Sequence, residues 1–287
     1  MARFDGDVPQ RFTVSDLGDL FSSIVVLVLL IASVTCGRLM IRWLPEQHRT
    51  RTTFQFTELV SNLLVTFTAL ILGLLTASVN ASFEKAETDL RSFGSQIIRL
   101  TNGLDEAGAP TLPIRVMLRT YTASAIATTW PEEPAPDGVY PKVSGKQAIE
   151  SEALGRLLAQ VEHNLRRLPA ADDLQRGLKS DCITRLNDLL NQRWRLIGEA
   201  HSTIPMPFYW MMLFWLVVVF LSFGMSAPRN WVSTAYVVMV ALCIAGAVFV
   251  ILELDGPLDG VIKVSSAPLR DALHHLDVSV ASLPVAD

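Results

Sequence analysis

Charged residues are scarce in this sequence. Only 18% of its 287 residues are Asp, Glu, Lys or Arg and half are hydrophobic, whereas a soluble globular domain carries roughly a quarter charged residues. The deficit is concentrated in four apolar runs, and the rest of the chain is ordinarily charged. The net charge of −4 gives no basic character of the kind that nucleic acid binding needs, so we expect no nucleic-acid partner.

Paired cysteines and catalytic motifs are also missing. The three cysteines have no CxxC spacing, which argues against a zinc knuckle or a redox pair. Cys36, Cys182 and Cys243 are each interpreted as small buried hydrophobes. The chain contains no GxSxG, HExxH, GxGxxG or P-loop sequence, so we expect neither an enzyme nor a cofactor. Asp271 and His275, four residues apart, are a conceivable metal pair, but a solvated helix face is the favoured interpretation and no metal site is predicted.

The four apolar runs are residues 20–36, 56–79, 208–223 and 231–254. A helix needs about 17 to 25 apolar residues to cross the hydrocarbon core, and only a helix satisfies its own backbone groups there. The segment before the first run is acidic and no A-x-A cleavage site follows the run, so we expect this run to be retained rather than removed as a signal peptide. The sequence predicts an all-α integral membrane protein with four transmembrane helices.

The orientation in the membrane can be argued from the basic residues. Arg38, Arg42, Arg49 and Arg51 surround the loop after the first run, and Arg229 lies in the loop between the last two runs. The positive-inside rule places both short loops in the cytoplasm, which puts the termini and the middle region outside.

The second run continues into a charged segment without a helix-breaking residue. A heptad stripe runs through this segment, and its period of 3.5 residues is typical of helices in supercoiled packing. Its members are Asn62, Val65, Ala69, Leu72, Thr76, Val79, Phe83, Ala86, Leu90, Phe93, Ile97, Leu100 and Leu104. We therefore predict one helix that leaves the membrane and projects as a stalk.

Within the membrane this helix carries small and polar residues that are candidates for a pore face or a helix interface. Ala69, Gly73 and Ala77 form a small-xxx-small pattern that permits close helix packing, and span four offers Ala241 and Ala245. Packing within one chain is the favoured interpretation, and a subunit interface or a pore is the alternative. The full candidate set is Glu58, Asn62, Thr66, Ala69, Gly73, Thr76 and Ala77.

The middle region is expected to form a helical bundle that stands on the membrane. Helix signals include Thr111 as a cap before Pro113, and Ser266 as a cap before a C-terminal helix with Pro268 in its first turn. The expected organisation is an N-terminal tail with two spans (1–79), a stalk and bundle continuous with the second and third spans (80–205), two further spans (206–254), and a tail with a short amphipathic helix (255–287).

The segment LELDGPLDGVIKVSSAPLRDAL, which begins in the last turn of the fourth run, resembles the C-terminal signature of a bacterial membrane family of unknown function labelled bestrophin-like. That signature is an LD-x-PF-x-G-type segment followed by a serine-capped helix. The matching residues are Leu254, Asp255, Pro257, Gly260, Ser266, Pro268 and Leu269. Leu258 stands where the family usually has Phe. The stalk and the TTWP sequence at 128–131 also resemble the family.

This resemblance implies a multi-pass protein of the bacterial inner membrane. The bestrophin label implies a homo-oligomeric anion channel whose middle region lies in the cytoplasm, opposite to the charge-based orientation. The first functional hypothesis is therefore an ion channel or transport protein. The second is a non-conducting membrane scaffold or sensor, whose helical bundle binds an unidentified protein partner or ligand.

Overall fold

The structure, a computed structural model, describes residues 14–43, 51–141, 151–199, 206–228, 230–258 and 260–281. All regular structure within these ranges is helical. The elements are α1 (Val14–Trp43), α2 (Arg51–Glu106), the 3-10 turn η2 (Ala109–Thr111), α3 (Leu112–Thr129), α4 (Glu152–Arg167), α5 (Asp173–Glu199), α6 (Met206–Ser226), α7 (Trp231–Leu254) and α8 (Ala267–Ala281). The acidic N-terminal segment, the basic loop at 44–50 and the expected link at 200–205 between the bundle and the third span lie outside the described residues.

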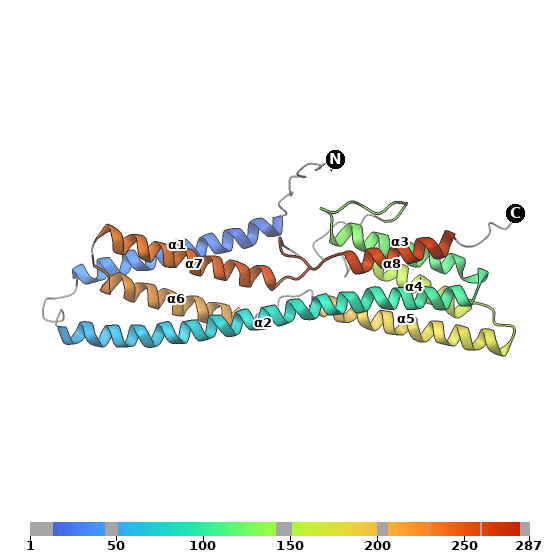
Figure 1. The fold of residues 1–287 in the computed structure, drawn as a ribbon, viewed down its shortest axis with the longest axis horizontal. Coiled ribbons are helices and arrows are strands. Elements are labelled where there is room, and N and C mark those ends of the chain that lie inside the picture. Colours follow the sequence, from blue (N-terminus) through green and yellow to red (C-terminus); the bar gives the residue numbers. More distant parts are fainter. Residues whose placement is uncertain are drawn as a thin grey trace, which may run out of the picture.

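Among the described residues, four helices are long and apolar enough to cross a membrane, as predicted. They are α1 over Leu20–Ile41, the first part of α2, α6 over Pro207–Ser226, and all of α7. These segments gather at one end of the molecule (Figure 1), around a cluster of buried apolar side chains that includes Val26, Leu30 and Phe220. The cysteine prediction is wrong in this region, because Cys36 and Cys243 are exposed, while Cys182 in the bundle is buried.

Two membrane helices, α1 and α6, approach each other closely through their backbones. A Cβ atom added to Gly37 would lie 2.3 Å from the Leu221 carbonyl oxygen, and one added to Gly224 would lie 2.2 Å from the Val34 carbonyl oxygen. Reciprocal glycines therefore let these two helices touch, as small residues do between membrane helices generally.

Helix α2 is unbroken over 56 residues, which at 1.5 Å per residue makes it about 84 Å long. The predicted continuous rod is therefore confirmed. Its heptad stripe is buried at almost every position from Val79 to Leu104, but Asn62, Val65, Ala69 and Thr76 are exposed. The seam does not continue there within one chain, because a straight α-helix drifts by about 20° per heptad relative to a 3.5-residue repeat.

The outer half of α2 packs mainly against α8 and α5, and α5 runs back alongside it (Figure 1). Helices α3 and α4 complete the bundle, with α3 packed against α8 and α4, and α4 packed against α5. The C-terminal helix docks on this bundle through Leu269, Leu273 and Leu276, as its apolar face predicts. Thr111 and Ser266, the two predicted caps, do lie at the starts of α3 and α8, but their hydroxyl groups make other hydrogen bonds. The Thr111 hydroxyl donates to the carbonyl oxygens of Leu104 and Gly108 at 2.7 Å rather than capping α3.

Candidate functional site

The predicted membrane candidates all lie on one exposed side of α2. Glu58, Asn62, Thr66, Gly73 and Thr76 are exposed in the single chain, as are Ala69 and Ala77. Asn80 and Glu84 continue the same three- and four-residue spacing beyond the membrane and are exposed as well. We call this set of nine residues, from Glu58 to Glu84, the α2 polar face.

A second exposed side of α2 has a different composition. It is formed by large apolar side chains whose exposed fractions are 57–68%, namely Phe56, Leu59, Leu63, Leu70 and Leu74. Large aliphatic and aromatic groups of this kind are suited to lipid tails. Because the lipid-compatible residues are gathered here, the α2 polar face is a chemically distinct surface of the same helix.

A third side of α2 packs against the same chain. Ser61, Thr68 and Val79 are buried on it, and Leu64, Leu72 and Leu75 pack against the membrane cluster. The favoured prediction of close intrachain packing at Ala69, Gly73 and Ala77 is therefore wrong for this chain: a Cβ atom added to Gly73 meets nothing within 4 Å. Ala241 and Ala245 of α7 are buried within the chain, as that prediction expected.

The threonine hydroxyls of the α2 polar face are turned back on their own helix. The Thr66 hydroxyl donates to the Asn62 carbonyl oxygen at 2.9 Å, and the Thr76 hydroxyl donates to the Leu72 carbonyl oxygen at 2.8 Å. This i−4 bond uses the only hydroxyl hydrogen and leaves the oxygen lone pairs available. At these two threonines the face therefore presents oxygen acceptors to whatever lies against it.

The residues that carried the family resemblance form a joint between α7 and α8. Glu253 is only 1% exposed, and its Oε1 accepts hydrogen bonds from the backbone N–H groups of Val261 and, at 3.2 Å, Ile262. Gly260 has φ +87°, and a Cβ atom there would lie 2.3 Å from the same carboxylate oxygen. Leu254, Asp255 and Pro257 thus lead into a turn that wraps a buried carboxylate.

This joint is fastened to the end of α3. Trp130 Nε1 donates to the Val264 carbonyl oxygen at 2.8 Å, which gives the predicted tryptophan–proline helix end a specific partner. Ser266, whose predicted role was a cap, donates its hydroxyl to Glu133 instead, and Arg270 Nε donates to the same carboxylate at 2.9 Å. The fourth span is in this way connected to the bundle by polar contacts.

Two further residues of the joint fit α8 against α2. A Cβ atom added to Gly94 would lie 2.6 Å from the Pro268 carbonyl oxygen, so the glycine makes room for the start of α8. Leu269, which follows, is 1% exposed in the bundle core.

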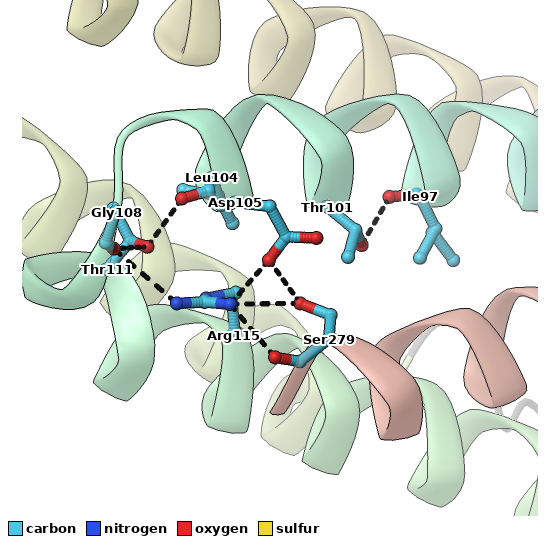
Figure 2. A network of polar contacts seen from close by, with 8 residues as sticks. All are labelled: Ile97, Thr101, Leu104, Asp105, Gly108, Thr111, Arg115 and Ser279. Atoms are coloured by element: carbon cyan, nitrogen blue, oxygen red, sulfur yellow. Dashed lines mark hydrogen bonds and ion pairs between the residues drawn. The ribbon is translucent and has the colours of Figure 1, made fainter. Parts of the chain in front are cut away.

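A buried arginine that the sequence analysis missed lies deeper in the bundle (Figure 2). Arg115 is 1% exposed and forms an ion pair with Asp105. It also donates to the Ser279 carbonyl oxygen at 3.0 Å and the Ser279 hydroxyl at 3.2 Å. The contacts join α2, α3 and α8. A single arginine among apolar residues gives no sequence signal that distinguishes it from a surface residue.

The structure, over its described residues, adds no third ligand to the conceivable metal pair. Asp271 and His275 are both exposed on α8, and no group of three or more potential metal ligands occurs in the part of the chain that the structure describes.

Four membrane-crossing helices joined to a helical bundle by one continuous helix define an all-helical, multi-pass membrane protein. A family profile described as the bestrophin-like domain matches residues 26–269, and the chain belongs to this family. Similar solved structures include two variants of a bacterial bestrophin homologue from Klebsiella pneumoniae. One is 16% identical, with 94% of this chain and 100% of that chain covered and a TM-score of 0.62. The other is 15% identical, with 92% and 100% covered and a TM-score of 0.58. A search of curated proteins finds no match.

Proposed function

We propose that this chain is one subunit of an oligomeric ion channel, and that the α2 polar faces of several copies line its pore. The observation that carries the proposal is the exposure of this face at membrane depth, beside a separate apolar face on the same helix. Polar groups within a membrane face a protein interior or a water-filled cavity rather than lipid. The membership of the bestrophin-like family supports the same function.

The single chain supplies one wall of such a pore. Its membrane cluster is filled by apolar side chains of α1, α6 and α7, with α2 at the side. Small residues at Ala69, Gly73 and Ala77 leave space along the exposed wall. Several copies arranged with this wall inward would enclose polar groups, while the α2 apolar face and the other spans meet lipid. We propose the bacterial inner membrane as the location.

The test is a paired bulky substitution in full-length protein that has been purified and reconstituted into liposomes. Ala69→Trp places an indole on the proposed pore wall and should abolish ion flux, because a pore is narrow. Leu70→Trp places the same group one residue away on the α2 apolar face and should leave the flux intact. Equal flux from both variants, or a mass of one chain by light scattering in detergent, contradicts the proposal.

A non-conducting scaffold or sensor is the second candidate, and a groove on the bundle favours it. The groove has a volume of 620 Å³, and its lining includes Arg156 of α4 and Arg193 and Trp194 of α5. The Trp194 side chain is 64% exposed, with the Arg193 guanidinium 5.7 Å from the centre of its ring. An oligomer that passes no ion at any voltage or pH would support this candidate over the channel.

A further inference from the structure

We propose that the groove between α4 and α5 binds the headgroup of an anionic phospholipid at the membrane surface. This α4–α5 groove is the one whose lining includes Arg156, Arg193 and Trp194. The inference goes beyond both candidate functions, because it needs only a bundle that stands on a membrane. Three features carry it together: the position of the groove along α5, the charge of its lining, and its tryptophan.

The register between α2 and α5 places the groove close to the membrane. Gln192 Nε2 donates to the Asp89 carbonyl oxygen at 3.1 Å and to Asp89 Oδ1 at 3.0 Å. At 1.5 Å per residue, Asp89 lies about 15 Å beyond Val79, where the apolar run of α2 ends. Because α5 runs back toward the membrane (Figure 1), Ile197 at the other end of the groove lies about 7 Å nearer to it. The headgroup layer is about 5 to 7 Å thick, so the groove begins at its outer edge.

The charged residues of the lining carry a net positive charge. They are Arg156, Arg193 and Glu152, and the other lining residues are uncharged. Glu152 Oε1 lies 3.5 Å from Arg156 Nη1 in an exposed pair, and such pairs contribute little. A lipid phosphate at the groove can therefore take the place of this carboxylate. Guanidinium groups suit that exchange, because they donate two parallel hydrogen bonds to a phosphate.

The second arginine is held in place from within the bundle. Arg193 is only 5% exposed and interacts with the buried Tyr121 hydroxyl. Burial raises the pKa of Tyr121 to about 12, so this phenol is neutral near pH 7 and does not cancel the charge of the arginine. Gly155 of α4 places no side chain over the guanidinium, since a Cβ atom there would lie 3.8 Å from Arg193 Nη2. The groove therefore contains a fixed positive charge.

Trp194 supplies the amphipathic ring that is typical of a membrane surface. Its side chain is 64% exposed, and the Arg193 guanidinium lies 5.7 Å from the centre of its ring. Tryptophan is enriched at the level of the headgroups. Ala159 and Ile197 add apolar lining to the groove of 620 Å³. Positive charge with an apolar border matches the phosphate and glycerol of a lipid better than it matches a soluble anion.

The experiment measures hydrogen–deuterium exchange of full-length protein in nanodiscs of phosphatidylcholine that contain increasing mole fractions of phosphatidylglycerol. The anionic lipid should slow the exchange of backbone N–H groups in residues 151–159 and 193–197. The mole fraction that gives half of this protection reports the affinity of the groove. Soluble glycerol 3-phosphate, added to nanodiscs of phosphatidylcholine alone, is the comparison for a free anion and should give no protection.

One pair of variants tests the charge of the groove. Arg156→Ala should raise the mole fraction at half protection about fivefold, which corresponds to about 1 kcal/mol for one arginine near an anionic surface. Arg166→Ala is its matched control and should leave the mole fraction unchanged. Arg166 forms the same kind of exposed pair on α4, with Glu162 at 2.8 Å, but does not line the groove.

A second pair tests the space in the groove. Gly155→Leu places a side chain in the groove and should abolish the protection by phosphatidylglycerol. Gly177→Leu adds the same side chain near the start of α5, where a Cβ atom meets nothing within 4 Å, and should keep the protection.

Each contrary result overturns a defined part of the proposal. The absence of protection by phosphatidylglycerol at both segments overturns the site. Equal protection by glycerol 3-phosphate shows a site for free anions and overturns the lipid as its ligand. Protection that survives both Arg156→Ala and Gly155→Leu places the lipid outside the groove. None of these measurements uses ion flux, so the channel function is tested separately.

Discussion

From Val79 to Leu104, one side of α2 is covered almost completely by side chains of the same molecule, whereas in its membrane stretch only 11% of the most apolar window is buried. The bundle therefore obtains its stabilisation from hydrophobic burial within one chain. The membrane region leaves most of its surface to lipid and, under our proposal, to other copies. The two regions share a helix, so a substitution in α2 should affect folding or assembly according to where it falls.

The largest effect on the bundle should come from Arg115→Ala. The change removes the cation that pairs with Asp105 and holds Ser279 of α8, and it empties a fully buried volume. The expected loss is about 4 kcal/mol in the free energy of unfolding. Thermal unfolding in detergent, followed by circular dichroism, measures it. Arg156→Ala breaks an exposed ion pair with Glu152 and should cost under about 0.5 kcal/mol. Similar losses from the two variants would contradict the proposed contribution of the buried Arg115 to stability.

Two glycine substitutions test the membrane region: Gly224 lies in a tight contact within the chain, whereas Gly73 has no neighbour in the single chain. Gly224→Ala would push a methyl group into the Val34 carbonyl at 2.2 Å and should destabilise the α1–α6 pair by about 3 kcal/mol. Gly73→Ala meets nothing within 4 Å and should leave the unfolding temperature of dissociated protein unchanged while altering assembly or conductance. If Gly73→Ala destabilised the single chain as strongly as Gly224→Ala does, the claim that Gly73 has no intrachain neighbour would be contradicted.

The joint between the regions is tested at Gly260, with a helical glycine of α5 as the control. Gly260→Ala combines φ +87° with a contact 2.3 Å from the Glu253 carboxylate and should cost about 2 kcal/mol. Gly177→Ala adds a Cβ atom that meets nothing within 4 Å and should not destabilise the protein, because alanine favours a helix over glycine. Thermal unfolding compares the two variants, and an unchanged stability of Gly260→Ala would contradict the contact at Glu253.

The smallest effect should be a pH dependence confined to the bundle. Burial raises the pKa of Tyr121 to about 12, against an opposing influence of Arg193. The folded state thus holds this proton more tightly than the unfolded state, whose tyrosine has a pKa near 10. Stability from this group is complete below pH 10 and is lost as the pH rises toward 12, by about 1 kcal/mol between pH 10 and 11. Tyr121→Phe should lack this contribution when unfolding is measured across that range.

The sequence was sufficient for the elements but not for the faces they bury. Apolar length predicted four spans, and the absence of a breaker predicted the unbroken α2, because both depend on local properties. The side of α2 that contacts its own chain depends on where α1 and α6 lie, so Gly73 was wrongly assigned to an intrachain contact and Gly37 and Gly224 were missed. Arg115 was missed for the same reason, since its partners come from positions 105 and 279.

The joint shows a related limit. The residues that matched the family signature could be identified by their order along the chain, but their role depends on Glu253, which lies outside that signature. A positive φ at Gly260 and the bond from Trp130 to Val264 are long-range consequences of packing. Neither the backbone conformation of Gly260 nor the partner of Trp130 can be predicted from a pattern in a single sequence.

Because α2 is one unbroken helix, its membrane end and its bundle end are mechanically coupled. About 84 Å of helix without a hinge turns as one body, so an inclination of about 5° around its midpoint displaces each end by about 4 Å in opposite directions. That displacement is comparable to the diameter of a partly hydrated ion. A tilt of the bundle would therefore move the opposite end of α2, at the far membrane surface, in the other direction.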